Sequence, residues 1–474
     1  MIINRNMSAV VTNRQLLRIE NKLAASMERL STGIKLNHAG DNPAGVAISN
    51  KMKTQIDALD QAETNASDAI SVVQIADGAL NEVSSMLQRM RELAVQAANG
   101  TNAFSERQSI QEEIDELQKE VDRISQDTEY NTKPLLDGSS DVRVYAEKAS
   151  RMYVSDTVDP ATYMINVEAT ATQAGMEVKY SEDLPEGTIN INGVTVEVSG
   201  SMPYDEYLYA IRTAAQEAGC MIEADETAQT LVIKSEYFGT DEGIEITCTQ
   251  ELAEAMGISE STEGAVLEDG VYIINKTGTN AKVSLPSDYE VSKFTSTTSI
   301  VADGNRVKIT DSNGFMIDFL LNESYEPTAI DEENGNYPIE VTDIGSMTIQ
   351  IGANEFQTMD VRITEVSSTS LYIDAIDVSK VNGAERAMTT LDDAIAKLTE
   401  CRSRLGAFQN RLEYATASLA ETGENMTSAY SGIMDTDMAE EMTNYTQQQI
   451  LSQAATSVLA QANEIPQQVL SLLR

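Results

Sequence analysis

The most constraining feature of the sequence is a hydrophobic pattern that runs almost without interruption from Pro43 to about Asn99. Asn42 and Pro43 are a typical helix start, because Asn caps free backbone amides and Pro fits the first helical turn. Apolar residues then recur three or four positions apart, with one slip near Val73–Ala76. No single globular core needs a helix this long, so we expect it to pack along other long helices.

Two further segments before residue 140 have a helical pattern. The first has a seven-residue recurrence and stops around residues 33–40; its seam residues are Leu16, Ile19, Leu23 and Leu30. The second opens with the pattern Ser105-x-x-Gln108, which predicts a capping box, and carries Ile110, Ile114 and Val121.

Two more helices are expected near the C-terminus. One starts near Asn382 and carries apolar residues at helical spacing as far as Leu419. The last carries the seam residues Met442, Tyr445, Leu451, Val458 and Ile465. It is almost uncharged from Tyr445 to Leu473, so it is a poor solvated helix and is expected to be buried against neighbours or copies of itself.

Between about residues 141 and 346 the hydrophobic period changes to two, which indicates strands. Asn192-Gly193 lies at the centre of a hairpin pattern over Thr188–Ser199. A short helix is expected around Tyr207–Ala215, and strands are expected at 230–235, 244–249, 271–276, 306–311 and 315–321. This central segment has 11 Lys and Arg against 38 Asp and Glu, so it carries −27 of the chain's net charge of −42.

Composition excludes several classes of function. The acidic balance disfavours nucleic acid and anionic membranes as partners, because both require a basic surface. A single histidine, His38, cannot form a multi-histidine metal site and leaves little scope for histidine-based acid–base catalysis. We therefore expect no enzyme activity, no catalytic residues, no metal and no cofactor. No stretch of 18 apolar residues occurs, and the N-terminus has no signal-peptide core, so no membrane insertion is expected.

Three cysteines give no framework of disulfides. Cys401 falls beside a helix seam and is expected to be a small packed residue. Cys220 and Cys248 are expected to be buried thiols on adjacent strands of the central segment, and whether they pair stays open.

Long motifs at both ends of the chain are similar to those of bacterial flagellins, the subunits of the flagellar filament. They are RLSTGIKLNHAGDNPAGVAIS (Arg29–Ser49), LQRMRELAVQAANGTN (Leu87–Asn102) and the run from Arg402 to Leu451. TIQIGANEFQTMDVRI (Thr348–Ile363) resembles the β-hairpin that flagellins place beside their helical domain. Two departures from the family pattern, HAGDNPAG after Asn37 and the Pro in YNTKPLLDG, do not disturb the resemblance.

The resemblance implies a mainly α fold with a β-rich central insert. Both chain ends would form a long antiparallel helical coiled-coil bundle, and the insert would be a variable α+β outer domain. The expected domains are the terminal helices of the inner filament core (1–43 with 435–474), a long-helix bundle with its β-hairpin (44–140 with 347–434), and a surface-exposed insert (141–346).

The implied function is that of a structural subunit that self-assembles into the helical flagellar filament for swimming. Its partners would be further copies of the chain, flagellar cap and hook-junction proteins, and an export chaperone at the C-terminus. Its location would be extracellular, after export by the flagellar type III apparatus without a cleaved signal peptide. The alternatives are a hook–filament junction protein of the same family and a flagellin with an enzymatic insert. The zinc-peptidase form of the latter is excluded, because it needs more than one histidine.

The resemblance also implies a site read by the vertebrate innate receptor Toll-like receptor 5. The matching positions are Gln88, Arg89, Leu93, Gln96 and Glu113. Arg89 and Leu93 lie four residues apart beside the helix seam, so they share one flank, and a partly exposed Leu beside an Arg suits a protein contact. The alternative is that Arg89 and Glu113 are solvated helix charges and Leu93 is a core-edge residue.

Overall fold

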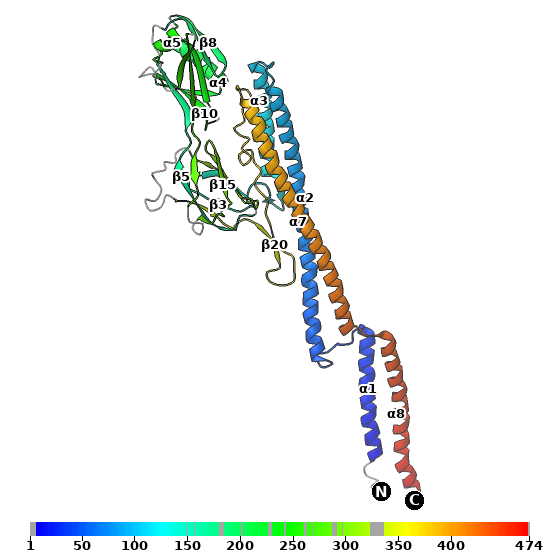
Figure 1. The fold of residues 1–474 in the computed structure, drawn as a ribbon. Coiled ribbons are helices and arrows are strands. Elements are labelled where there is room, and N and C mark those ends of the chain that lie inside the picture. Colours follow the sequence, from blue (N-terminus) through cyan, green and yellow to red (C-terminus); the bar gives the residue numbers. More distant parts are fainter. Residues whose placement is uncertain are drawn as a thin grey trace. The chain divides into compact units, whose positions relative to one another are not determined.

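The computed structural model shows two compact units, each assembled from distant parts of the chain (Figure 1). Unit 1 contains residues 1–69, 349–359 and 411–474, and unit 2 contains residues 70–348 and 360–410. The structure describes residues 6–147, 149–155, 157–179, 184–200, 202–225, 230–240, 243–259, 262, 264–268, 270–286, 292–295, 297–322 and 336–472.

The helices are those expected, plus a short one in the insert. They are α1 (Met7–Thr32), α2 (Pro43–Ala97), α3 (Phe104–Asp127), α4 (Tyr204–Glu217), α5 (Gln250–Ala255), α7 (Gly383–Met434) and α8 (Met438–Leu472).

The strands fall mostly in the central insert. Those of the first half of the chain are β1 (Glu129–Tyr130), β2 (Lys133–Pro134), β3 (Val144–Tyr145), β4 (Ala149–Val154), β5 (Ala161–Ala169), β6 (Gln173–Lys179), β7 (Gly187–Ile191), β8 (Val194–Val198), β9 (Cys220–Asp225) and β10 (Thr230–Phe238). The others are β11 (Gly243–Thr249), β12 (Ala265–Glu268), β13 (Val271–Thr277), β14 (Lys282–Ser284), β15 (Ser299–Asp303), β16 (Arg306–Thr310), β17 (Met316–Leu321), β18 (Asn336–Val341), β19 (Met347–Gln350) and β20 (Thr358–Val361).

Unit 1 joins the two chain ends, with α1 and α8 side by side (Figure 1). Gly33 ends α1 in a left-handed conformation, with φ 72°, and its amide bonds to the Arg29 carbonyl at 2.8 Å. The chain segments after α1 and before α8 then pair: the Lys35 amide donates to the Met434 carbonyl, and the Thr436 amide to the Gly33 carbonyl. The two helices therefore run antiparallel from a common end.

Unit 2 buries the seam of the long helices. Leu80, Leu87 and Met90 of α2 and Leu391 and Leu405 of α7 have no exposed surface. Arg91 Nε lies 2.5 Å from Asp392 Oδ1, and Arg402 Nε lies 2.9 Å from Asp77 Oδ1. In the first ion pair α2 provides the arginine, and in the second α7 provides it. A shift of one helix along the other would break both pairs.

The central insert contains two subdomains with separate cores. We call the first the sandwich subdomain; its sheets are β14-β5-β18-β3 and β15-β16-β17-β4, and both contribute to one core. The second, the α+β subdomain, has sheets β6-β10-β9 and β12-β13-β11-β7-β8 with α4 and α5. The chain passes between them at 169–173 and 277–282, where Thr172 and Thr279 form a β-bridge.

The sequence expectations for the insert are confirmed for the hairpin, the helix α4 and the five strand segments. Asn192 and Gly193 have φ of 45° and 92°, the positive values that a two-residue turn between β7 and β8 requires. The expectation for the cysteines was wrong in one respect. Cys220 and Cys248 are buried free thiols, but they lie on β9 and β11, which belong to different sheets.

The capping-box prediction at Ser105 was also wrong. α3 begins two residues earlier than expected for that box, at Phe104, and Ala103 precedes it. The side chain that closes this end is Glu106, whose Oε2 accepts a hydrogen bond from the Ala103 amide at 3.1 Å. A carboxylate in the first turn satisfies a free amide as well as the predicted glutamine would, and it also complements the helix dipole.

Candidate assembly surface and receptor-contact face

Hydrogen bonds join α1 and α8 at both ends of the pair, but a groove remains between the two helices along their length. At the open end, Asn6 Oδ1 accepts from the Ala9 amide to cap α1, while Asn6 Nδ2 donates to the Ala462 carbonyl of α8 at 2.8 Å. Between the ends lies a groove of about 1080 Å³ with a mixed lining. Its apolar residues include Val11, Ile19, Leu451 and Val458, and its polar residues include Arg18, Lys22 and Gln447. Two helices alone therefore leave a space along their shared face.

The seam residues predicted for the terminal helices differ in solvent exposure between α1 and α8. On α1, Ile19 is buried and Leu16, Leu23 and Leu30 are half-buried. On α8, Tyr445 is half-buried, whereas Met442, Leu451, Val458 and Ile465 are exposed. Val458 and Ile465 keep 51% and 54% of their surface accessible. The less exposed positions of α8 include large and small side chains: Gln448, Ala455 and Leu459 are half-buried and Ala462 is buried.

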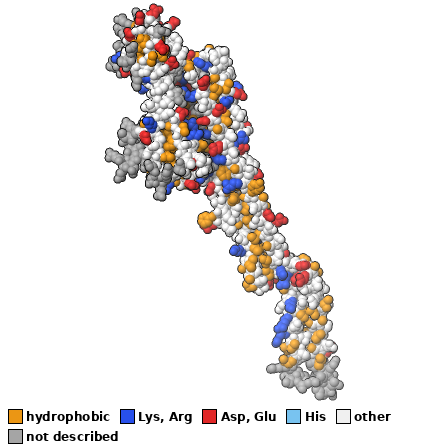
Figure 2. Space-filling model, viewed as in Figure 1, with side chains coloured by type: hydrophobic (Ala, Val, Ile, Leu, Met, Phe, Trp, Pro, Cys, Tyr) orange, Lys and Arg blue, Asp and Glu red, His pale blue; other side chains and the backbone are white. Residues whose placement is uncertain are grey.

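Other apolar side chains on the same helices lie outside the predicted seam. Val10, Val11, Leu17 and Met27 on α1 and Ile450 on α8 are also exposed. Figure 2 shows hydrophobic side chains reaching the surface along this helix pair. The signal that could have found them is apolar residues lying off the seven-residue seam, which widen the stripe beyond what one partner helix covers. The pair therefore presents a broad apolar surface, which we call the assembly surface.

The receptor-contact face predicted from the resemblance lies on α2 and α3. Arg89 Nη2 lies 2.8 Å from Glu113 Oε1, so these two charges form an exposed ion pair between the helices. The hydrogen bond and charge of Glu113 raise the pKa of the Arg89 guanidinium. Gln88 and Gln96 are exposed on α2.

Leu93 does not match its expectation. Its side chain is 2% exposed, so the interpretation of a partly exposed leucine beside an arginine is wrong. It lies one residue before Ala94 of the buried seam and is buried with Met90, Ala94 and Ala97 of the same helix. Leu93 is thus a core residue beneath the face formed by Arg89, Glu113 and the two glutamines.

Other candidate chemistry has structural explanations in the described residues. His38 Nε2 lies 2.9 Å from Glu28 Oε1, at the turn that follows α1. Across the described ranges no group of three His, Cys, Asp or Glu side chains is placed to hold a metal ion. Cys401 is buried, as expected, and its burial raises the pKa of the thiol. No helix in the described part of the chain has both the length and the apolar character of a bilayer-spanning segment.

Two chain ends that pair as helices and leave an apolar surface uncovered, with a β-rich insert between them in the sequence, are the architecture of a structural subunit. Comparison with known proteins agrees. The bacterial flagellin N-terminal helical region matches residues 3–141, and the bacterial flagellin C-terminal helical region matches residues 388–473.

Related chains are similar over their whole length. A flagellin of Clostridium tyrobutyricum is 32% identical, over 98% of this chain and 99% of its own. A flagellin of Salmonella typhimurium is 33% identical, over 100% of this chain and 99% of its own. Flagellin D of Vibrio anguillarum is 29% identical, over 99% of both chains. The chain belongs to the bacterial flagellin family, whose members are structural subunits of the flagellar filament, not enzymes.

Proposed function

We propose that this chain is a subunit of the filament itself, and that it polymerises by burying the assembly surface of α1 and α8 against the same helices of other copies. The observation that carries this proposal is the groove of about 1080 Å³ between two helices whose apolar side chains stay exposed. Burying apolar surface contributes roughly 25 cal/mol per Å², so several half-exposed Val, Leu and Ile side chains supply a strong driving force.

Head-to-tail contacts between such surfaces form an open helix when the rotation between copies does not close into a ring. The low charge of α8 supports this arrangement, because copies can approach without strong repulsion. The acidic insert, with −27 of the −42 charge, would keep neighbouring filaments apart.

The test is nucleated polymerisation of the full chain and of two truncated chains, one lacking residues 1–42 and one lacking residues 438–474. Both truncated chains should stay monomeric at concentrations at which the full chain forms filaments visible by electron microscopy. The reason is that either deletion removes one wall of the groove. Filaments from either truncated chain would contradict the proposal.

The alternative role is a junction protein between hook and filament. The relatives named above are flagellins that match over nearly the whole chain, which favours the filament. Cellular abundance separates the two roles, because a filament is built from many copies and a junction from few. Export by the flagellar type III apparatus, chaperone binding at α8, and contact with cap and hook-junction proteins belong to the same proposal.

We further propose that a host's Toll-like receptor 5 contacts the face formed by Arg89, Glu113, Gln88 and Gln96. The exposed Arg89–Glu113 pair favours this, since arginine is frequent at the energetic centre of protein interfaces. Replacing Arg89 with Ala should weaken binding of the monomer to the receptor ectodomain about ten-fold, measured by surface plasmon resonance.

Arg123→Ala is a matched control, because Arg123 forms similar exposed ion pairs with Glu120 and Asp127 farther along α3. It should leave binding unchanged. Equal effects of the two substitutions would remove Arg89 from the contact. Leu93→Ala is unsuitable as a test, because it opens a cavity in the core.

A further inference from the structure

Polar contacts join the insert to the helical part of unit 2 and the segment before α7. They include the Arg151–Asp374 ion pair at 2.7 Å and two larger clusters. The first cluster, which we call the lock, is centred on Asp318 of β17, whose side chain is 0% exposed. Arg306 donates to it with Nε at 3.1 Å and Nη2 at 2.7 Å, and Lys397 of α7 donates with Nζ at 2.8 Å. The ring of Tyr372 lies 4.4 Å from the Arg306 guanidinium carbon and 4.7 Å from Lys397 Nζ. The lock therefore holds the sandwich subdomain on α7 with desolvated charges.

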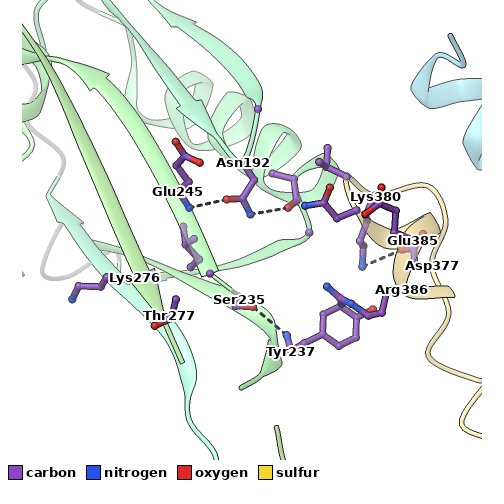
Figure 3. A pocket seen from close by; sticks show the side chains of 18 of the residues that line it. Asn192, Ser235, Tyr237, Glu245, Lys276, Thr277, Asp377, Lys380, Glu385 and Arg386 are labelled. Atoms are coloured by element: carbon purple, nitrogen blue, oxygen red, sulfur yellow. Dashed lines mark hydrogen bonds and ion pairs between the residues drawn. The ribbon is translucent and has the colours of Figure 1, made fainter. Parts of the chain in front are cut away.

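The second cluster, which we call the latch, connects the α+β subdomain to the segment before α7 (Figure 3). Lys380 forms an ion pair with Glu236 of β10 and lies 3.0 Å from Asp377. The Tyr237 hydroxyl donates to the Ala375 carbonyl at 3.2 Å, and the guanidinium of Arg386 lies 3.8 Å above the Tyr237 ring. The Val381 amide donates to the Glu217 carbonyl, at the end of α4, at 3.1 Å.

The carboxylate of the latch lies nearer to solvent than that of the lock. In the lock, Asp318 is 0% exposed, and Lys397 and Arg306 are 10% and 22% exposed. The side chains of Lys380 and Glu236 are 16% and 32% exposed. Beside them lies a cleft of about 920 Å³ with polar walls, including Asn192, Glu245 and Lys276 on the subdomain side (Figure 3). The described core of the α+β subdomain contains no residue from the segment before α7, so polar contacts hold this joint.

The covalent connection at this point is narrow. Two chain segments, 169–173 and 277–282, join the subdomains through the Thr172–Thr279 bridge. Gly278 is required there, because a Cβ atom would lie 2.2 Å from the Thr172 carbonyl oxygen. The turn between β10 and β11 also bonds to this neck: the Gly239 amide donates to the Thr172 carbonyl at 3.3 Å, and Asn280 Oδ1 accepts from the Thr240 and Gly304 amides. Release of the latch therefore permits a limited rotation about the neck.

We propose that the α+β subdomain is a movable arm, which the Lys380–Glu236 latch holds against the start of α7 and which rising ionic strength releases. Salt screens exposed and partly exposed charges strongly, as the Debye length falls from about 30 Å at 0.01 M to about 3 Å at 1 M, but buried pairs much less. The lock keeps the sandwich subdomain in place while the cleft beside the latch widens.

The experiment is amide hydrogen exchange on the full chain, with the Val381 amide as the reporter of the latch. Raising salt from about 0.05 M to about 1 M should speed its exchange about five-fold, while the amides of β11 keep their protection. Glu236→Gln should produce a similar increase at low salt and remove most of the salt dependence.

Glu223→Gln is the matched control. Glu223 pairs with Lys234 at 2.6 Å within the α+β subdomain and takes no part in the latch, so Val381 exchange should be as in the unaltered chain. Exchange at Val381 that is insensitive to salt in the unaltered chain would overturn the proposal, whether or not Glu236→Gln folds. So would an equal response to Glu236→Gln and Glu223→Gln.

Discussion

The terminal helices α1 and α8 and the long helices α2 and α7 have similar seven-residue apolar patterns but differ in how well the chain covers them. In unit 2, the seam residues Leu87 and Leu405 have no exposed surface. In unit 1, Val458 and Ile465 of α8 remain half-exposed. The difference shows that the apolar side chains of a helical seam are fully buried only when enough neighbouring elements surround the helix. Unit 2 has these neighbours within one chain, since α2 lies against both α3 and α7. Within the described residues, the helix that packs along α1 is α8.

The largest expected effect is on the stability of the folded monomer. Leu87→Ala should lower the free energy of unfolding by about 3 kcal/mol, because it leaves a cavity in a fully buried seam. Val458→Ala should change it by less than about 0.5 kcal/mol, because that side chain already contacts water. Urea unfolding followed by circular dichroism measures both.

The same two variants should reverse their order in polymerisation. Val458→Ala should raise the concentration needed for filament growth more than Leu87→Ala does, measured by sedimentation. If Val458→Ala destabilised the monomer as much as Leu87→Ala, the contrast between covered and uncovered seams would be wrong.

Charged side chains should show the same contrast between buried and exposed positions as the apolar seams do. Asp318→Asn should cost about 3 kcal/mol at pH 7, because Arg306 and Lys397 lose the carboxylate that compensates their burial. Burial opposes the ionisation of Asp318, but hydrogen bonds from Arg306 and the charge of Lys397 outweigh it and lower the pKa of the carboxyl. Burial lowers the pKa of Lys397, and the charge of Arg306 lowers it further, which together outweigh the opposing effect of Asp318.

The pH dependence follows from the sign of this shift. A carboxyl with a lowered pKa in the folded state stabilises the fold above its ordinary pKa of about 3.9 and loses that contribution as pH falls through the folded value. The difference between the unaltered chain and Asp318→Asn, taken from urea unfolding at several pH values, should therefore shrink in acid. Glu116→Gln on α3 is the control, because the side chains of Glu116 and of its ion-pair partner Lys119 are 74% and 70% exposed. A gap that stays constant with pH would argue against the lock.

The smallest expected effect concerns the ion pairs between α2 and α7. Arg402→Ala should cost less than about 1 kcal/mol, because Arg402 and Asp77 are both partly exposed. The cost should fall further at high salt, measured by urea unfolding at two ionic strengths. A cost of several kcal/mol would mean that ion pairs, rather than the buried apolar seam, hold the long helices together.

The sequence predicted the helices and many of the strands because their local signals are strong. Asn42 and Pro43 mark the start of α2, and Asn192-Gly193 marks a turn that needs positive φ. The start of α3 was placed wrongly, because several residues near it can satisfy free amides and the pattern does not say which one does.

The candidate sites were predicted less completely than the helices and strands. The resemblance indicated Arg89 and Glu113, and the structure pairs them across two helices. It did not reveal that Leu93 is buried, because whether a residue beside a seam is covered depends on how many helices surround it. The lock and the latch were invisible in the sequence, because Asp318 lies 79 residues from Lys397 and Glu236 lies 144 residues from Lys380.

The sequence by itself determined that this chain has two helical ends around an acidic, β-rich insert, and that its composition suits a structural role better than a catalytic one. Periodicity and charge are local properties, so they can be read without coordinates. Only the tertiary structure decided which apolar stripes are satisfied within one chain and which are left on the surface. That depends on contacts between residues far apart in sequence, and it separates the buried seam of α2 and α7 from the uncovered one of α1 and α8.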